Sequence, residues 1–374
     1  MIGIDCDFPG GNIIAERIEG DTLVLCPDMR DTAGSWFYWA FRLRGAAGRR
    51  LAIRFSAHTP VGMRGPALSR DGGLTWQWST EPFTTEGFTL TVPQGQDDLL
   101  VTFAPLYTQA EWERFLAGRA PEGGWQRHVL CQSRKGRDVE WLALGAPADT
   151  AAHRVVFTAR HHCCEMIANF VMEGIIDGIL ADDEPGAWLR RQAAFCCIPF
   201  VDKDGVEDGD QGKNRRPRDH NRDYVGESLY PETAAIRDFL PRWGGTRGIA
   251  AALDIHCPWI RGRNNDVIYQ VGREAPENWR EQTRFGQFVE GALRPGALPY
   301  RTADNLPFGQ EWNTAANFSA GMSFSRWSAG LPGMRLPTSF EIPYAEASGV
   351  AVTADGARRF GSAVARALAA YLQA

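Results

Sequence analysis

Several features that often reveal a protein's function are scarce in this sequence of 374 residues. The formal net charge is −5, so the chain has no excess of positive charge for binding nucleic acid or an anionic membrane. No uninterrupted apolar run approaches the roughly 18 residues that a membrane-spanning helix requires. The first residues, MIGIDCDFPGGN, lack the basic start and apolar centre of a signal peptide. We therefore expect a soluble, cytoplasmic protein with neither nucleic acid nor membrane as partner.

The eight cysteines contain no CxxC motif and show no regular spacing. Four of them form two adjacent pairs, Cys163–Cys164 and Cys196–Cys197, and neighbouring cysteines rarely bridge each other. In a cytosolic chain such residues are usually reduced and buried, where they behave as small apolar side chains. We therefore expect no disulfide framework.

The chain is longer than a single hydrophobic core usually serves, which favours two domains. Residues 1–118 alternate short β-rich runs with turn residues, which is typical of an antiparallel sheet or sandwich. The runs are FYWAFRLRG, RRLAIRFSA, SRDGGLTWQWS, GFTLTV and LLVTFAP. We predict an antiparallel, β-sandwich-like N-terminal domain over residues 1–118.

Residues 119–374 change to a pattern of strands and helices. The predicted strands are HVLCQS, VEWLALG, RVVFTA, AFCCIPFV, GIAAALDIH, VIYQVG and SFEIPYA. Several are nearly continuous apolar runs, as expected for a sheet covered on both faces. Residues 165–180 and 355–373 place apolar side chains at helical spacing. We expect an α/β domain with a mixed, mainly buried sheet flanked by helices.

Three predicted strands end in residues that can carry chemistry, and functional groups collect at strand ends in α/β sheets. His162 and Glu165 follow one strand and are three residues apart, so both side chains can point at one centre. His256 ends a second strand, and Glu341 lies in a third. Two imidazoles and one carboxylate are the ligand set of a catalytic zinc, which keeps a position open for water. We expect Cys163 and Cys164 to point away from this centre.

Neighbouring residues have more ordinary interpretations. Asp254, two residues before His256, can orient an imidazole ligand. We interpret His161 as a residue of the turn, and His220 as a packing or hydrogen-bonding residue. Glu346 is an alternative to Glu341 as a general base.

Five motifs in order resemble those of the zinc carboxypeptidase family, most closely its cytosolic-carboxypeptidase-like branch with a β-rich domain before the catalytic one. The zinc motif is similar to Ala159–Glu165, ARHHCCE, although the family usually has Pro-Gly where this chain has Cys163–Cys164. The sequence VDKDGV, residues 201–206, resembles NPDGV. Residues 219–222, DHNR, and 254–256, DIH, match two further motifs, and Glu341 stands where the family has its catalytic glutamate.

The resemblance implies a soluble zinc metallocarboxypeptidase that removes the C-terminal residue of a peptide or protein. It implies that one Zn²⁺ is bound by His162, Glu165 and His256. It also implies that Glu341 is the general base, activating a water molecule that zinc has made more acidic. Asn221 and Arg222 would bind the terminal carboxylate of the substrate, since a guanidinium matches a carboxylate with two parallel hydrogen bonds.

Two further roles are open within the resemblance. An arginine should polarise the scissile carbonyl, and the candidates are Arg215, Arg216 and Arg218. We select Arg215 from its GKNR context. Arg326, fifteen residues before Glu341, falls in a region that lines the side-chain pocket in relatives. A positive charge there would favour a C-terminal acidic residue such as glutamate.

Two other functions compete with this interpretation. A zinc-dependent N-acyl amino acid deacylase can use the same two histidines and glutamate. A non-catalytic binding protein on a peptidase fold would lack part of the site, whereas here His162, Glu165, His256 and Glu341 are all present. The β-rich first part and the DHNR segment favour the peptidase.

Overall fold

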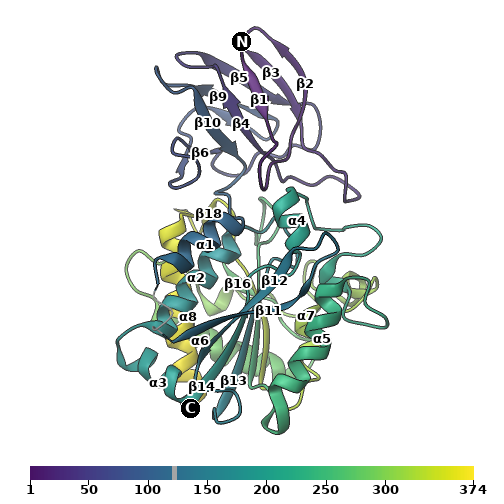
Figure 1. Ribbon diagram of the computed structural model, residues 1–374, viewed down its shortest axis with the longest axis vertical. Coiled ribbons are helices and arrows are strands. Elements are labelled where there is room, and N and C mark those ends of the chain that lie inside the picture. Colours follow the sequence, from purple (N-terminus) through teal and green to yellow (C-terminus); the bar gives the residue numbers. More distant parts are fainter. Residues whose placement is uncertain (120–123) are drawn as a thin grey trace.

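The computed structural model describes residues 1–119 and 124–374. Figure 1 shows β-sheets from the first part of the chain at one end and a larger α/β part at the other. The predicted fold class is confirmed, because the large part contains a mixed sheet flanked by helices and the first part consists of β-sheets. The boundary between residues 118 and 119 stays a prediction.

The β-rich part contains two five-stranded sheets. The first runs, in spatial order, β1 (Gly3–Asp5), β4 (Ala40–Arg44), β10 (Asp98–Thr102), β6 (Ala67–Ser69) and β7 (Gln77–Trp78). The second runs β2 (Ile14–Glu19), β3 (Thr22–Cys26), β5 (Arg50–Phe55), β9 (Gly87–Thr91) and β8 (Phe83–Thr84). Strand β5 alternates exposed or half-exposed with buried residues, as a half-buried strand should. One pair, β3 with β5, is parallel, which the predicted antiparallel arrangement did not include.

The α/β part is built on a seven-stranded sheet that contains all seven predicted strands. Its spatial order is β11 (Trp125–Gln132), β12 (Asp138–Gly145), β14 (Ala193–Ile198), β13 (His153–Ala159), β15 (Ala251–His256), β17 (Leu336–Glu341) and β16 (Tyr269–Gln270). The four strands from β14 to β17 are parallel, and the others pair antiparallel. Strands β14, β15 and β17 are buried along their whole length. Helices therefore cover both faces of this sheet.

Eight α-helices, several short 3-10 helices and a small hairpin complete the structure within the described residues. The helices are α1 (Gln109–Ala117), α2 (Ile167–Leu180), α3 (Glu184–Gln192), α4 (Lys203–Asp208), α5 (Pro231–Gly244), α6 (Pro276–Ala292), α7 (Phe324–Ser328) and α8 (Ala354–Gln373). The hairpin joins β18 (Glu346–Ala347) and β19 (Val350–Ala351). Figure 1 shows α2, α6 and α8 on one side of the sheet and α5 and α7 on the other. None of the helices within the described residues is both long and apolar enough to cross a membrane.

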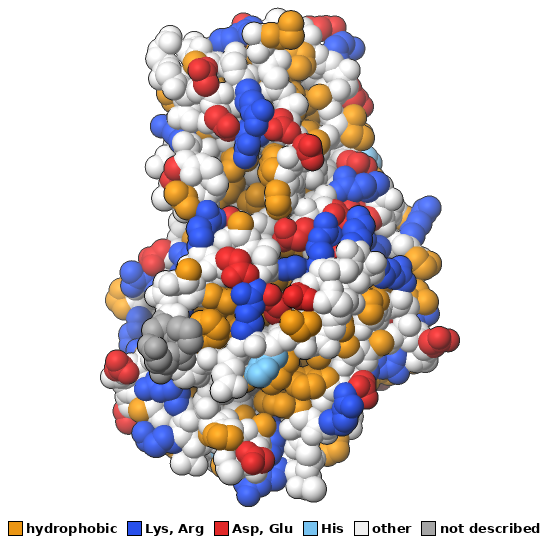
Figure 2. Space-filling model, in the orientation of Figure 1, with side chains coloured by type: hydrophobic (Ala, Val, Ile, Leu, Met, Phe, Trp, Pro, Cys, Tyr) orange, Lys and Arg blue, Asp and Glu red, His pale blue; other side chains and the backbone are white. Residues whose placement is uncertain are grey.

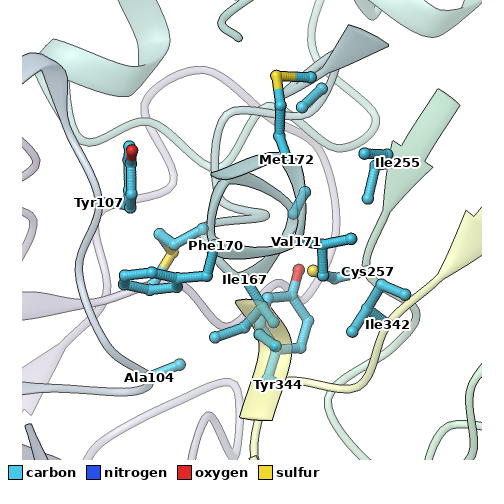
Figure 3. Close-up of a cluster of buried hydrophobic side chains, with 14 of the residues drawn as sticks. Ala104, Tyr107, Ile167, Phe170, Val171, Met172, Ile255, Cys257, Ile342 and Tyr344 are labelled. Atoms are coloured by element: carbon cyan, nitrogen blue, oxygen red, sulfur yellow. The ribbon is translucent and has the colours of Figure 1, made fainter. Parts of the chain in front are cut away.

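Helix α2 lies at the centre of the main hydrophobic core. It crosses α8 closely, because a Cβ on Gly174 would lie 1.9 Å from the carbonyl oxygen of Arg358. Figure 3 shows Phe170 of α2 near Tyr107, from the segment that links the β-rich part to α1. The two rings meet edge to face with centroids 4.9 Å apart. The core is therefore continuous from the α/β part into the segment after β10.

Charged side chains gather where the β-rich part meets the α/β part. Figure 2 shows acidic and basic groups side by side over this junction. Arg137 pairs with Asp204 and Asp208 of α4, each at 2.8 Å. Arg30 of the β-rich part pairs with Asp210 at 2.8 Å. Helix α4 is thus paired with the α/β part, and the loop after it with the β-rich part.

Candidate active site

The parallel strands bring the predicted chemical groups to one edge of the sheet. His256 and Glu341 are register partners at the carboxyl ends of β15 and β17. β13 is the neighbour of β15, and its end leads into the turn that carries His162 and Glu165. Glu165 and His256, 91 positions apart in sequence, thus meet because carboxyl ends of parallel strands lie at the same edge.

The turn between β13 and α2 is held by a buried arginine. Arg160 has a φ of 62°, in the left-handed region that residues other than glycine rarely adopt. Its guanidinium donates hydrogen bonds to the carbonyl oxygens of Cys163 and Tyr107 and, at 2.7 Å, to Oδ1 of Asn169. These bonds stabilise a backbone conformation that would otherwise be unfavourable.

His162, Glu165 and His256 converge on one point. Nδ1 of His162 lies 3.0 Å from Oε1 of Glu165, and Nδ1 of His256 lies 2.8 Å from Oε2. One donor atom from each residue lies within 4.8 Å of the others. Glu165 and His256 are buried, and the His162 side chain is 13% exposed, so the point is reachable from a cavity.

The cysteines and His161 are directed elsewhere. Sγ of Cys163 donates to the carbonyl oxygen of Asp210 at 3.1 Å, and Sγ of Cys164 lies 3.7 Å from the Tyr344 hydroxyl. Burial raises the pKa of both thiols, so both stay protonated near neutral pH. His161 bonds Asp254 and Tyr224, each at 2.8 Å.

The outer nitrogens of the two histidines have polar partners. Nε2 of His256 lies 2.6 Å from Oδ2 of Asp254, as expected for a carboxylate that orients an imidazole. Asn221 Nδ2 lies 3.2 Å from the same nitrogen. Nε2 of His162 lies 3.7 Å from Oδ1 of Asp219. Asp254 also binds His161, so it belongs to a second possible metal group, His161–Asp254–His256, which shares His256 with the first.

The charges in the cluster explain its ionisation. Burial raises the pKa of Glu165, but the positive charges of Lys213, His256 and His162 outweigh burial and hold the pKa well below its usual range. Burial lowers the pKa of His256, but Asp254 and Glu165 outweigh it and raise the pKa well above the usual value. The Glu165 carboxylate is therefore ionised, and the carboxylates of Asp254 and Glu165 favour positive charge at His256.

The donor set fits a metal ion. Both imidazoles present Nδ1 to one carboxylate, and their outer nitrogens lie near Asp254 and Asp219. The thiols of Cys163 and Cys164 point away. Two nitrogen ligands with one carboxylate are typical of catalytic rather than structural zinc.

The cluster opens into a cavity of about 500 Å³, which we call the main cavity. Of the site residues predicted from the sequence, five line this cavity: His162, His256, Glu341, Asn221 and Arg222. A larger cavity of about 670 Å³ lies between the β-rich part and helices α1, α2 and α8. It contains none of the predicted site residues, so we place the chemistry in the smaller cavity.

Glu341 faces the cavity with one free oxygen. Within the described residues, its buried Oε2 has no hydrogen-bond partner. Burial raises its pKa to about 7, although the charges of His256 and Lys213 act in the opposite direction. Such a carboxyl can exchange a proton near neutral pH. Glu346, the alternative base, instead pairs with Arg64 at 2.7 Å.

Arg222 presents a guanidinium without an acidic partner. Its nitrogens donate to the Asn221 and Asn317 carbonyl oxygens at 2.9 and 3.2 Å. No carboxylate among the described residues pairs with it within 4 Å. The side chain of Asn221 accepts from the backbone N–H of Phe324 at 2.9 Å, which fixes its amide. An anion entering the cavity would meet an unneutralised charge.

The two remaining predicted residues lie away from this cavity. Arg215 pairs with Asp202 at 2.6 Å and with Asp210 at 2.9 Å, which hold its guanidinium in a buried ion network. Arg326 pairs with Glu274 at 3.0 Å and lines a small adjoining cavity. Neither residue is in the lining of the main cavity.

Lys213, two residues before Arg215 in the chain, has its side chain in the cavity wall. It lines the cavity, and its ammonium nitrogen lies 2.7 Å from Oε1 of Glu165 and 2.6 Å from the carbonyl oxygen of Cys257. The GKNR context contained this residue, but the spacing did not distinguish it from Arg215.

Arg273 is a largely buried arginine that no motif in the sequence singles out. Burial lowers the pKa of its guanidinium to about 10, and the charge of Arg326 adds to the effect. Its Nε has no partner among the described residues, and its other contacts are long, 3.4 Å to Ser325 Oγ and to the Arg326 carbonyl oxygen. Ser325 and Val271 line both the main and the adjoining cavity. Arg273 therefore lies just behind the wall of the main cavity.

Aromatic side chains complete the wall, and no spacing in the sequence singles them out. They are Trp36, Trp259, Tyr269, Trp312 and Phe318. Tyr269 is the register partner of Glu341, and Trp312 donates to its hydroxyl at 3.3 Å. Trp36 comes from the β-rich part of the chain.

Comparisons with known proteins agree with this fold. No family model matches the chain. Cytosolic carboxypeptidase 3 of Mus musculus is 26% identical over 202 residues, 50% of this chain and 19% of that protein. Cytosolic carboxypeptidase 2 of Danio rerio is 27% identical over 257 residues, 65% of this chain and 32% of that protein. The chain thus spans between about a fifth and a third of the length of these relatives.

Two solved structures match over nearly the whole chain. A metallo-carboxypeptidase from Burkholderia cenocepacia superposes with a TM-score of 0.80 at 19% identity, covering 100% of this chain and 99% of that one. A metallo-carboxypeptidase from Pseudomonas aeruginosa, in complex with (2-guanidinoethylmercapto)succinic acid, gives 0.77 at 20% identity, covering 99% of each. The resemblance inferred from the motifs is confirmed, and the fold is that of the metallo-carboxypeptidases.

Proposed function

We propose that this protein is a zinc-dependent carboxypeptidase that hydrolyses the last peptide bond of a peptide or protein. The observation that carries the proposal is the convergence of His162, Glu165 and His256 in a cavity that also holds Glu341 and Arg222. The likeness to metallo-carboxypeptidase structures supports it. Cytoplasmic location stays a prediction, supported by the names of the curated relatives.

His162, Glu165 and His256 would hold the metal ion. A bound Zn²⁺ would act as a Lewis acid and lower the pKa of a water molecule towards about 7. Glu341, whose pKa is about 7, would accept a proton from that water and pass it to the leaving amine. Its free oxygen and its position in the cavity wall suit this transfer.

Arg222 and Asn221 would bind the terminal carboxylate of the substrate. The guanidinium of Arg222 has no acidic partner among the described residues, so a carboxylate would supply the missing negative charge. Binding there requires a free C-terminus. This requirement distinguishes a carboxypeptidase from an endopeptidase.

Lys213, rather than Arg215, would offset negative charge that develops on the scissile carbonyl oxygen. Lys213 lines the cavity beside Glu165, whereas Arg215 is neutralised by Asp202 and Asp210 outside it. Losing one such donor typically costs roughly 10²–10³ in rate.

We further propose a preference for an acidic terminal residue such as glutamate. Arg273 and Arg326 lie behind Ser325, and Arg273 has no acidic partner among the described residues. A buried cation without a counter-charge is costly, and a carboxylate entering this wall would relieve the cost. The charge of Arg326 is already met by Glu274, so Arg273 is the stronger determinant.

The direct test uses pairs of peptides that differ only at the C-terminus. The zinc-loaded full chain should release one residue from each peptide with a free carboxylate and none from its amide, as measured by mass spectrometry. N-acetylglutamate serves as the third substrate. Equal cleavage of acid and amide, or preference for N-acetylglutamate over every peptide, would refute the carboxypeptidase assignment.

A further inference from the structure

Trp36 places part of the β-rich segment in the wall of the candidate active site. Its ring faces that of Trp259 with centroids 5.1 Å apart and planes inclined at 56°. Phe37, which is buried, meets Trp259 edge to face at 5.0 Å. Trp259 keeps 40% of its surface exposed. The two indoles thus form an open aromatic wall supported from behind.

The segment that carries Trp36 is fixed to the loop that carries Lys213. Both carboxylate oxygens of Asp31 accept backbone N–H groups of this loop, from Gln211 at 3.0 Å and from Gly212 at 2.9 Å. The Thr32 hydroxyl donates to the carbonyl oxygen of Lys213 at 2.5 Å. These bonds join residues about 180 positions apart, so the position of Trp36 relative to the cavity is set by direct contacts.

The same loop packs against the turn of the predicted metal ligands. A Cβ on Gly212 would lie 2.5 Å from the backbone nitrogen of Cys163. With a φ of 73°, Gly212 also has a backbone conformation that other residues rarely adopt. One rigid wall is therefore formed by three segments: the β-rich segment with Trp36, the loop with Lys213, and the turn between β13 and α2.

Trp36 and Arg222 both line the cavity, but they contact different residues of its wall. Arg222 contacts Asn221, Asn317 and the ring of Phe318. Trp36 contacts Ala33 and the rings of Phe37 and Trp259. Among the described residues, the two sets of hydrogen bonds and ring contacts have no member in common. In a peptide whose terminal carboxylate binds Arg222, a side chain at Trp36 would then belong to a residue upstream of the scissile bond.

We propose that Trp36 and Trp259 form a subsite for an apolar, preferably aromatic, side chain upstream of the scissile bond. The β-rich part thereby acts as a specificity element of the active site. Indole faces bind flat apolar groups well, and aromatic pairs prefer inclined or offset contacts such as this wall offers. This inference rests on the proposed function, since it orients the peptide from Arg222.

The test compares peptides that share a free C-terminal glutamate and differ upstream. Phenylalanine or serine occupies the first or the second position before the terminal residue. Removing a partly buried phenylalanine contact costs about tenfold, so the wild type should favour phenylalanine by roughly that factor in kcat/KM at one position. Trp36→Ala and Trp259→Ala should each abolish most of this preference, and Trp36→Phe should keep part of it. Trp76→Ala is the control, because Trp76 lies in the β-rich part and lines the other cavity.

Dissociation constants of the same peptides for the Glu341→Gln protein provide a readout that does not need turnover. The expected result is a matching preference in binding, lost with Trp36→Ala in that background. If preference is unchanged in Trp36→Ala and in Trp259→Ala, the subsite does not exist, even if the wild type is an active carboxypeptidase. If no peptide is hydrolysed but the tryptophan-dependent preference in binding remains, the function fails and the subsite stands. Circular dichroism and zinc content identify variants that fail to fold, and the two separate tryptophan variants guard against that loss.

Discussion

The ammonium nitrogen of Lys213 lies 2.7 Å from Oε1 of Glu165, inside the wall of the candidate active site. Glu165 also contacts His162 and His256, so one buried carboxylate faces a lysine and two imidazoles. The lysine loop is held in turn by Asp31 of the β-rich part. A residue of the first segment thus positions a cation beside the proposed metal ligands.

Replacing Lys213 should slow catalysis without abolishing zinc binding. Lys213→Met removes the charge at nearly the same volume, and we expect kcat to fall roughly 10²–10³-fold. Lys213→Arg keeps the charge and should lose less. Steady-state kinetics with zinc content measured on the same samples checks this. Arg215→Met is the comparison: a larger loss of kcat in a folded, zinc-loaded Arg215→Met protein would return the role to Arg215.

Glu341 should control the acidic limb of the pH profile. A general base must be ionised, so activity should rise with pH through the pKa of Glu341, which burial raises to about 7. Glu341→Gln should lower kcat by roughly 10²–10⁴-fold and remove this limb from the residual activity. Measuring kcat/KM from pH 5 to 9 for both proteins decides the matter. A limb that persists unchanged in Glu341→Gln would assign the titrating group elsewhere.

The raised pKa of Glu341 also makes the stability of the protein depend on pH. A carboxyl whose pKa is higher in the folded than in the unfolded chain favours folding in its protonated form. Glu341 therefore contributes stability below its ordinary pKa of 4.5, and this contribution is lost as pH rises through about 7. In the zinc-free protein, Glu341→Gln should raise the free energy of unfolding at pH 8 more than at pH 5. Urea unfolding at the two pH values measures this, and an equal effect at both would contradict the shifted pKa.

Most of the fold could be predicted because its strands carry clear local signals. The apolar runs RVVFTA and GIAAALDIH became β13 and β15, with His256 at the end of β15. The parallel pairing of β3 with β5 was missed, because strand direction depends on the connection between strands and not on the period of their residues.

The strand pattern alone indicated only the site residues at strand ends, whereas Asn221 and Arg222, which also line the cavity, were predicted from the DHNR motif. His162, Glu165, His256 and Glu341 meet because parallel strands share one edge. Loop residues could not be placed in this way. Arg215 points into a network with Asp202 and Asp210, while Lys213, two residues before it, faces the cavity. The different directions of Lys213 and Arg215 depend on Asp31, which binds this loop from about 180 residues away, so no local sequence pattern predicts them.

Metal binding should depend on His162, Glu165 and His256 and not on the thiols between them. His162→Ala and His256→Ala should each lose stoichiometric zinc, whereas a Cys163→Ser, Cys164→Ser double variant should retain it. Binding at 100 times the dissociation constant stabilises the folded state by about 2.7 kcal/mol, so a chelator should lower the melting temperature. Zinc content by emission spectrometry and thermal unfolding with and without chelator check this. Loss of zinc in the double serine variant would instead show that the cysteine thiols bind the metal.

The preference for an acidic terminal residue should depend on Arg273. Its buried guanidinium has no acidic partner among the described residues, so a substrate carboxylate gains a charge-assisted hydrogen bond of about 1.5–3 kcal/mol there. Arg273→Met should therefore reduce the ratio of kcat/KM for glutamate- over glutamine-terminated peptides by roughly ten- to a hundredfold. Arg326→Met is the matched control, and its effect should be smaller because Glu274 already pairs with Arg326 at 3.0 Å. Because both peptides keep the terminal carboxylate, damage to Arg222 would lower both rates and leave the ratio unchanged. A ratio near one in the wild type, or an equal loss in both variants, would remove Arg273 from the specificity pocket.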